Sequence, residues 1–275
     1  MKFCTTPKGT RVAYEKETSE VSGLPPMVLL HGFCEDHSVW SPVKSRLKSQ
    51  SLLLIDLPGF GASELPIKAD MAAYSEAVKA VLDAEGIARC VLIGHSMGGY
   101  AALEFAARCP EQLSGLGLVH SHPFEDTEDR KTARRRGIET LQAGKRDLYV
   151  TQLFPNLFPA SFLERNPDTL NELISNGKKQ SPEGIAAALQ AMMTRRDQQQ
   201  TLSQAKYPVL FLLGALDTLV PPEPGMKAAL LPAVVDLHLL PEVAHMAMYE
   251  RPEETAAILN SFWDFCESRI VNPKS

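Results

Sequence analysis

Residues Val91 to Cys109 read VLIGHSMGGYAALEFAARC, and this stretch decides the expected fold. It begins with an apolar run of β-preferring residues that stops at Gly94, and a helical pattern of apolar residues starts at Met97. Between them, Ser96 stands in a G-x-S-x-G pattern. Because glycines tolerate turns that are too tight for larger residues, we expect a strand, a sharp turn that exposes the serine hydroxyl, and then a helix.

Similar apolar runs occur on both sides of this stretch. Buried strands are expected at residues 90–93, 27–30, 52–55, 116–120, 208–213 and 234–240, and a hairpin at residues 2–6 and 11–15. Helical patterns lie between them, at residues 38–47, 74–85, 97–108, 224–231 and 252–268. Buried strands that alternate with helices indicate a mostly parallel sheet, so the sequence predicts an α/β fold.

The alternation stops between residues 122 and 204. This segment has helical patterns at 128–143, 145–153, 168–177 and 182–193 and no convincing strand. We expect a helical cap, or lid, inserted after the sixth strand and lying over the sheet edge where active sites form, on a core made of residues 1–121 and 205–275. Within the cap, the basic run Arg130 to Arg136 is expected to be a solvated helix face.

The composition is that of an ordinary globular protein, with 275 residues, 44% hydrophobic and 22% charged. A net charge of -5 argues against a nucleic-acid-binding surface. The sequence has neither an apolar run of about 18 residues nor the apolar core of a signal peptide, so no membrane contact is expected. Five scattered cysteines without C-x-x-C spacing are typical of free thiols in a reducing cytoplasm.

A serine hydroxyl needs a base to remove its proton, and the base needs an acid to orient it. Because the carboxyl ends of parallel strands meet at one sheet edge, these partners should follow other strands. Asp217 comes four residues after the 208–213 strand, and His245 comes five residues after the 234–240 strand. The sequence therefore predicts Ser96 as nucleophile, Asp217 as acid and His245 as base, with Asp126 as the alternative acid.

The other histidines have simpler interpretations. His95 precedes the serine and should point away from it into packing, and His238 alternates with apolar neighbours and should lie at the surface. His120 and His122 end a strand before the cap and are expected at the pocket. Their H-x-H spacing could bind a metal, but no further ligands accompany it, so no metal site is predicted.

The order of serine, aspartate and histidine is that of α/β-hydrolases, and the chain resembles that superfamily. It is most similar to the small capped serine hydrolases, which include carboxylesterases, C–C hydrolases and cofactor-free haloperoxidases. The resemblance is carried by HGF (31–33), DLPGFGAS (56–63), GHSMGG (94–99), GALDTLVP (214–221) and AHM (244–246). It implies an α/β-hydrolase fold with a mostly parallel eight-stranded sheet. It also implies an oxyanion hole made by the N–H groups of Phe33 and Met97, with His31 shaping the loop.

These features together favour a serine hydrolase that cleaves a small, largely apolar ester or related acyl compound through an acyl-enzyme, without a cofactor. Phe33, Met97, His120 and Met246 are the expected substrate contacts. C–C bond hydrolysis or a synthase-like elimination with the same triad is a second interpretation, and a non-catalytic ligand receptor is a third. The expected partner is a small-molecule substrate, with no nucleic acid and no membrane. The chain is expected in the cytoplasm as a monomer or homodimer.

Overall fold

The architecture is built on one eight-stranded sheet, seen in a computed structural model that describes residues 1–18, 24–48 and 51–271. The strands are β1 (Lys2–Thr5), β2 (Arg11–Thr18), β3 (Met27–Leu30), β4 (Ser51–Ile55), β5 (Cys90–His95), β6 (Leu113–Val119), β7 (Val209–Gly214) and β8 (Val235–Leu240). Their spatial order is β1-β2-β4-β3-β5-β6-β7-β8. Strand β2 pairs antiparallel with β1 and β4, and the remaining pairs are parallel. The predicted α/β fold with a mostly parallel sheet is therefore confirmed.

The central strands are buried along their whole length. Every residue of β3, β5, β6 and β7 is buried, which explains why their sequences are continuous apolar runs rather than alternating ones. The edge strand β8 instead alternates exposed and half-buried residues, including the half-buried His238. Because these central strands pair in parallel, their carboxyl ends meet at one edge of the sheet.

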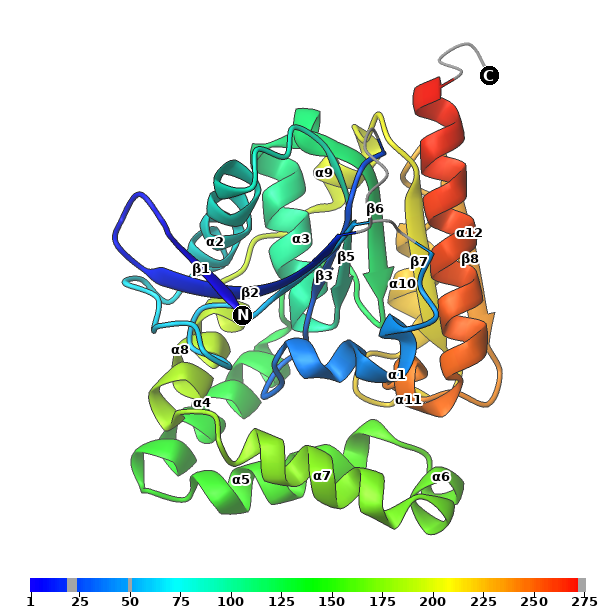
Figure 1. Ribbon diagram of the computed structural model, residues 1–275. Helices are drawn as coiled ribbons and strands as arrows, with labels where there is room; N and C mark the ends of the chain where they lie inside the picture. Colours follow the sequence, from blue (N-terminus) through cyan, green and yellow to red (C-terminus); the bar gives the residue numbers. More distant parts are fainter. Residues whose placement is uncertain (19–23, 49–50, 272–275) are drawn as a thin grey trace.

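Helices cover both faces of the sheet. In Figure 1, α2 (Met71–Ala84) and α3 (Met97–Arg108) lie on one side, with α1 (Ser41–Lys44) and α12 (Pro252–Val271) on the other. The shorter elements of the core are η1 (His37–Trp40), η2 (Pro110–Gln112), α10 (Pro222–Ala228) and α11 (Ala247–Glu250). The segment predicted as one helix over 38–47 is instead η1 followed by α1, because Pro42 favours a new helix start near its own position.

Between β6 and β7 the chain forms a group of helices that we call the cap. It consists of α4 (Glu128–Gln142), α5 (Arg146–Leu153), η3 (Phe154–Leu157), α6 (Ala160–Arg165), α7 (Pro167–Gly177), α8 (Pro182–Met193) and α9 (Gln199–Ser203). Figure 1 shows α5, α6 and α7 as a layer below the sheet. Sequence periodicity located α4, α5, α7 and α8 to within one residue but missed α6 and α9, which are too short to show a clear helical period.

The cap is joined to the carboxyl edge of the sheet by specific hydrogen bonds. The side chain of Gln180 accepts from the N–H of Gly61 at 2.9 Å and donates to Asp36 at 3.3 Å. The carbonyl of Leu157 accepts from the N–H of His245 at 3.0 Å. The cap therefore contacts the loops that carry the predicted catalytic residues.

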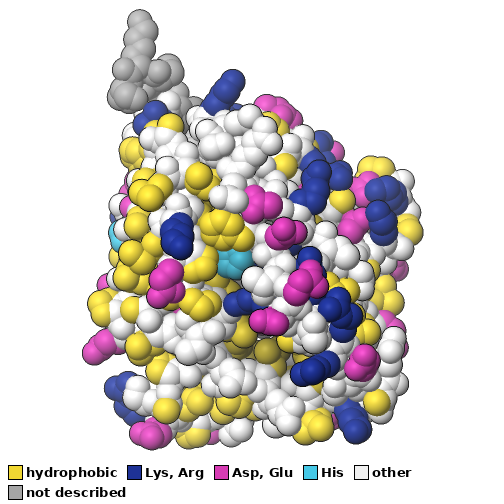
Figure 2. All heavy atoms as spheres, turned by 180° about the vertical axis from the view of Figure 1, so that it is seen from behind, with side chains coloured by type: hydrophobic (Ala, Val, Ile, Leu, Met, Phe, Trp, Pro, Cys, Tyr) yellow, Lys and Arg dark blue, Asp and Glu magenta, His cyan; other side chains and the backbone are white. Residues whose placement is uncertain are grey.

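The surface carries charges of both signs. In Figure 2, Lys and Arg side chains stand among Asp and Glu side chains on the face shown. Within the described ranges, no helix is both long and apolar enough to cross a bilayer.

Candidate active site

Ser96 lies at the turn between β5 and α3 in a strained backbone conformation, with φ 50° and ψ -113°. A non-glycine residue with positive φ is uncommon, and such strain is found most often at functional sites. Two hydrogen bonds hold the turn: the Ser96 N–H donates to Val119 O at 2.8 Å, and the Ser121 hydroxyl donates to Ser96 O at 2.9 Å. The predicted strand, sharp turn and helix are thus present.

The glycines at positions 94 and 98 allow this turn to close. A Cβ atom on Gly94 would lie 2.3 Å from the carbonyl oxygen of Gly98. A Cβ atom on Gly98 would lie 2.6 Å from the carbonyl oxygens of Leu30 and His31. Any side chain at either position would therefore collide with backbone, which is the physical basis of the G-x-S-x-G pattern here.

Asp217 and His245 form a buried acid–base pair. Nδ1 of His245 lies 2.7 Å from Asp217 Oδ2, and Asp217 Oδ1 accepts from the N–H groups of Leu219 and Val220 at 3.0 and 2.8 Å. Burial opposes ionisation of Asp217, but the charge of His245 and hydrogen bonds from His120 and His245 outweigh it and hold the pKa of Asp217 far below its usual range. The ionised carboxylate therefore keeps the proton of His245 on Nδ1 and leaves Nε2 as the basic nitrogen.

The imidazole of His245 lies close to the serine turn. Its ring packs against that of His95, the residue before Ser96, with ring centroids 5.0 Å apart. The described hydrogen bonds do not include one between Ser96 Oγ and His245 Nε2, a contact that in many hydrolases becomes short only when substrate is bound. The structure thus pairs His245 with Asp217, places His245 against the residue before Ser96, and has Ser96 facing a cavity.

The two predicted oxyanion donors are the N–H groups of Met97, at the start of α3, and of Phe33, in the loop after β3. Met97 is the first residue of α3, and N–H groups in the first turn of a helix lack a partner within that helix. The N–H of Gly32 is already used by Glu35 Oε2 at 2.7 Å, so the N–H of Phe33 is the next donor along that loop. His31 holds the loop from behind, because its Nδ1 donates to Gly32 O and its Nε2 accepts from the N–H of Leu57.

His120 does not line the cavity as the sequence analysis expected; it lies behind Asp217. It is fully buried with φ 49°, and its Nε2 accepts from the N–H of Ala247 at 3.3 Å. The proton must then be on Nδ1, which lies 3.4 Å from Asp217 Oδ2. Burial lowers the pKa of His120 to about 4, so a neutral imidazole lies beside the carboxylate.

Two further expectations about substrate contacts are also wrong. The side chains of Met97 and Met246 are fully buried and do not reach the cavity, because both residues point into the packed core at the starts of α3 and α11. Phe33 does line the cavity. The sequence patterns located the loops correctly but did not determine which way these side chains face.

A second buried acid–imidazole pair, Glu35 and His95, was missed by the sequence analysis. Nδ1 of His95 lies 3.1 Å from Glu35 Oε2, and its Nε2 donates to the backbone carbonyl of His245 at 2.9 Å. Burial disfavours a charged His95, but the facing carboxylate outweighs it and raises the pKa of His95. His95 therefore points away from Ser96 as predicted, yet it also connects Glu35, in the loop after β3, to the backbone of His245.

Glu250 holds the histidine loop from the other side. Its carboxylate accepts from the N–H of Ala244 at 2.8 Å and from the N–H of Met246 at 2.9 Å, the two residues that flank His245. Burial raises the pKa of Glu250 to about 7. A carboxylate five residues after the histidine was visible in the sequence, but only the short helix α11 brings it back to the loop.

Ser96 opens into a cavity of about 430 Å³, within the range typical of small-molecule sites. Most of its wall is apolar and comes from the cap and from the loop after β7. The lining side chains are those of Phe33, Ser96, Tyr100, Asp129, Arg130, Ala133, Arg134, Tyr149, Leu153, Leu189, Met192, Thr218, Leu219 and Val220. The expectation that the basic run from residue 130 would be wholly solvated is therefore wrong at Arg130 and Arg134.

Asp126, the alternative acid, has different partners. It is buried and accepts from Arg195 Nη1 at 2.6 Å and from Arg134. These two guanidinium groups hold the pKa of Asp126 below its usual value against the effect of burial. Asp126 thus anchors the cap, and Asp217 is the carboxylate at the histidine.

Two groups of side chains in the described ranges come close enough to share a metal ion: His120 with Asp217 and His245, and Asp36 with His37 and Asp56. His122 belongs to neither. In the first group, Asp217 already accepts from the histidine and from two backbone N–H groups. In the second, Asp56 accepts from the backbone N–H groups of His37 and Ala62. Hydrogen bonds therefore account for both arrangements.

The fold and these three residues define a class: an α/β hydrolase with a serine at the nucleophile turn and a histidine–aspartate pair beside it. Residues 27–258 match the model of the alpha/beta hydrolase family, and the chain belongs to that family.

Three relatives illustrate its range. A 2-succinyl-6-hydroxy-2,4-cyclohexadiene-1-carboxylate synthase of Klebsiella pneumoniae is 27% identical, with 86% of this chain and 93% of that protein covered. Lipase 1 of Psychrobacter immobilis is 25% identical, with 98% and 86% covered. The structure of a thermophilic esterase from Thermogutta terrifontis, solved with malate bound, is 28% identical with a TM-score of 0.90, and covers 97% of this chain and 98% of that one.

Proposed function

We propose that this protein is a serine hydrolase that cleaves a small ester through an acyl-enzyme. The observation that carries the proposal is Ser96, held in a strained turn at the cavity with the buried Asp217–His245 pair beside it. The similarity to a lipase and to an esterase supports the choice of an ester bond.

The geometry suggests the order of steps. Ser96 Oγ attacks the ester carbonyl while His245 Nε2 takes its proton, and Asp217 stabilises the imidazolium that forms. The N–H groups of Phe33 and Met97 hold the oxyanion. The imidazolium returns the proton to the departing alcohol, and a water molecule activated by the same nitrogen then hydrolyses the acyl-enzyme to the acid.

The test is hydrolysis of p-nitrophenyl butyrate by the wild type, by Ser96→Ala and by Ser203→Ala, an exposed serine on α9 that serves as the matched control. We expect Ser96→Ala to lower kcat by about 10⁴-fold or more and the control to match the wild type. Turnover by Ser96→Ala equal to that of the wild type would contradict the proposal.

A second candidate is C–C bond hydrolysis or elimination with the same triad, and the similarity to a cyclohexadiene-carboxylate synthase favours it. Turnover of a vinylogous diketone, lost in Ser96→Ala, with no turnover of esters would support this alternative.

We further infer a cytoplasmic location and a small-molecule substrate, with the chain acting as a monomer or homodimer. All five cysteines are free thiols, and Cys34, Cys90 and Cys266 are buried, as suits a reducing compartment. Fractionation of cells that make the tagged protein tests the location, and the mass of the protein in solution tests the oligomeric state.

A further inference from the structure

We propose that the substrate of this site carries a carboxylate, which Arg130 and Arg134 bind at the cap wall of the Ser96 cavity. The inference rests on the proposed function and adds to it a substrate class: an ester joined by an apolar chain to a single negative charge. It departs from the expectation of a wholly apolar substrate.

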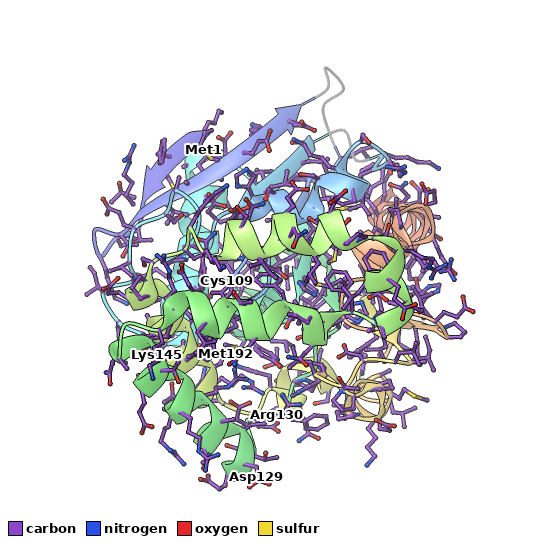
Figure 3. All side chains as sticks on the ribbon, turned by 90° about the horizontal axis from the view of Figure 1, so that it is seen from below. Met1, Cys109, Asp129, Arg130, Lys145 and Met192 are labelled. Atoms are coloured by element: carbon purple, nitrogen blue, oxygen red, sulfur yellow. The ribbon has the colours of Figure 1, made fainter. Side chains whose placement is uncertain are left out.

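The cap helix α4 directs charged side chains into the cavity. Asp129, Arg130, Ala133 and Arg134 are spaced so that they share one face of the helix, and all four line the cavity together with Ser96. Figure 3 shows α4 from below, between the labelled Asp129 and Lys145, with Arg130 on the side toward the middle of the molecule. Of the other cations of the basic run, Arg135 and Arg136 are exposed, and Lys131 is paired with Glu128.

Arg130 has donors to spare. Among the described residues, the one hydrogen bond of its guanidinium runs from Nη2 to the carbonyl of Leu219 at 2.6 Å, which fixes the guanidinium beside the loop that follows Asp217. A guanidinium has five N–H donors in a planar fork that suits a carboxylate. Arg130 is half-buried at the cavity wall and has no carboxylate partner in the part of the chain that the structure describes. Its free N–H donors can therefore bind an anion that enters the cavity.

The charges around the cavity leave a surplus of one. Arg134 and Arg195 share the buried Asp126, and Arg195 also stacks on Tyr100, with its guanidinium carbon 4.0 Å from the ring centroid. The charged side chains that line the cavity are two guanidinium groups, Arg130 and Arg134, and one carboxylate, Asp129. One excess positive charge matches a monoanionic carboxylate better than a phosphate dianion.

The same charged groups affect the pKa of His122. Burial, together with the charges of Arg195, Arg130 and Arg134, lowers its pKa to about 3, while Asp126 acts in the opposite direction. The histidine is consequently neutral and neither adds to nor offsets the positive charge near physiological pH.

The other residues of the cavity wall indicate the character of the rest of the substrate. Phe33, Tyr149, Leu153, Leu189 and Met192 surround the space near the serine and the arginines with apolar surface. A carboxylate bound at the cap with its ester at the serine therefore needs an apolar connection between them, as in a half-ester of a dicarboxylic acid or an ester of a carboxylated alcohol.

The test uses substrates that match in shape and differ in charge. Mono-p-nitrophenyl adipate has the same number of heavy atoms as p-nitrophenyl 6-methylheptanoate but ends in a carboxylate. 4-Carboxyphenyl butyrate and 4-isopropylphenyl butyrate place the same difference on the alcohol side. We expect the wild type to prefer the carboxylate in at least one pair by about 10-fold or more in kcat/KM, chiefly through a lower KM.

The variants separate this inference from a general loss of charge. Arg130→Gln should remove the preference, measured as the ratio of kcat/KM between the charged and the neutral ester of each pair, and Arg130→Lys should retain part of it. The matched control is Arg136→Gln, which removes one cation from the exposed side of the same helix and should leave the preference unchanged. Arg134 is unsuitable for a single substitution because its loss would leave Asp126 short of a partner.

The outcomes are distinct. Ser96-dependent cleavage of the neutral esters with no carboxylate preference, or a preference that survives in Arg130→Gln, would overturn this inference and leave the proposed function standing. If no ester is cleaved, the proposed function fails, and calorimetry with mono-methyl adipate decides the inference. Binding that weakens about 10-fold in Arg130→Gln would support it, and absence of binding to the wild type would overturn it.

Discussion

The loops at the sheet edge and the cap meet at one cavity but are built differently. In the loops, hydrogen bonds hold the backbone around His245: its N–H donates to Leu157 of the cap, its carbonyl accepts from His95, and Glu250 accepts from both neighbouring N–H groups. The cap contributes apolar walls and the unmatched charge of Arg130. Under the proposed function, rigid loops would hold the reacting groups in place, and the cap would select the substrate.

This difference separates two kinds of substitution. Changes in the sheet-edge loops should lower kcat for every substrate, because they alter transition-state stabilisation. Changes in the cap wall should alter KM and the choice among substrates, because they act on parts of the ligand that do not react.

The largest effect is expected for Asp217→Asn. An amide at this position would favour the wrong tautomer of His245 and stabilise no imidazolium, so kcat on p-nitrophenyl butyrate should fall by about 10³- to 10⁴-fold with little change in KM. Steady-state kinetics checks this.

Asp126→Asn is the comparison, because Asp126 is paired with Arg134 and Arg195 in the cap. Folded Asp126→Asn, verified by circular dichroism, should keep kcat within about 10-fold of the wild type. A larger loss in Asp126→Asn than in Asp217→Asn would reverse the assignment of the acid.

A smaller effect, on stability, is expected for Glu250→Gln. Because the pKa of Glu250 in the folded protein is raised to about 7, the folded state binds more protons than the unfolded state between pH 4.5 and 7. Its contribution therefore favours folding at low pH and is lost as the pH rises through 7. A neutral glutamine lacks this dependence, so the free energy of unfolding of Glu250→Gln relative to the wild type should rise by about 1 to 2 kcal/mol between pH 5 and pH 8.

Urea titrations at the two pH values measure this difference, with the exposed Glu254→Gln on α12 as the control. A relative stability of Glu250→Gln that stays constant or falls over this range would show that Glu250 ionises normally in the folded protein.

The smallest effect is expected for Leu153→Ala, which enlarges the cavity from the cap side. Because the leucine is half-buried, its removal should lower the free energy of unfolding by about 1 kcal/mol or less. The added space should lengthen the preferred acyl chain by one or two carbons, which corresponds to a change of a few-fold in kcat/KM. A chain-length series of p-nitrophenyl esters records the shift. The exposed Leu148→Ala on the same helix should leave the series unchanged, and an unaltered series in Leu153→Ala would remove that residue from the substrate path.

The same contrast explains what the sequence could predict. Buried strands are visible in the sequence as apolar runs, so the fold could be predicted from patterns. The carboxyl ends of parallel strands meet at one edge, so the pairing of Asp217 with His245 could be predicted as well. The identity of the acid was open only because Asp126 also follows a strand.

Side-chain direction was not accessible. His120, predicted at the end of a strand, takes a positive φ and lies behind Asp217, and Met246, in a predicted loop, points into the core. The roles of Glu35 and Glu250 depend on contacts with loops distant in the sequence or on one short helix. Arg130 belongs to a run that is mostly solvated, and only the packing of α4 shows which cations face the cavity.

The central claim is that Ser96 is an activated nucleophile at a site assembled by the sheet-edge loops. Incubation of the folded protein with a fluorophosphonate probe, followed by mass spectrometry of its peptides, tests this most directly. We predict one adduct, on the peptide that contains Ser96, which is absent from Ser96→Ala and slowed by about 10³-fold in Asp217→Asn. A folded wild-type protein that acquires no adduct, or acquires it at another residue, would contradict the account.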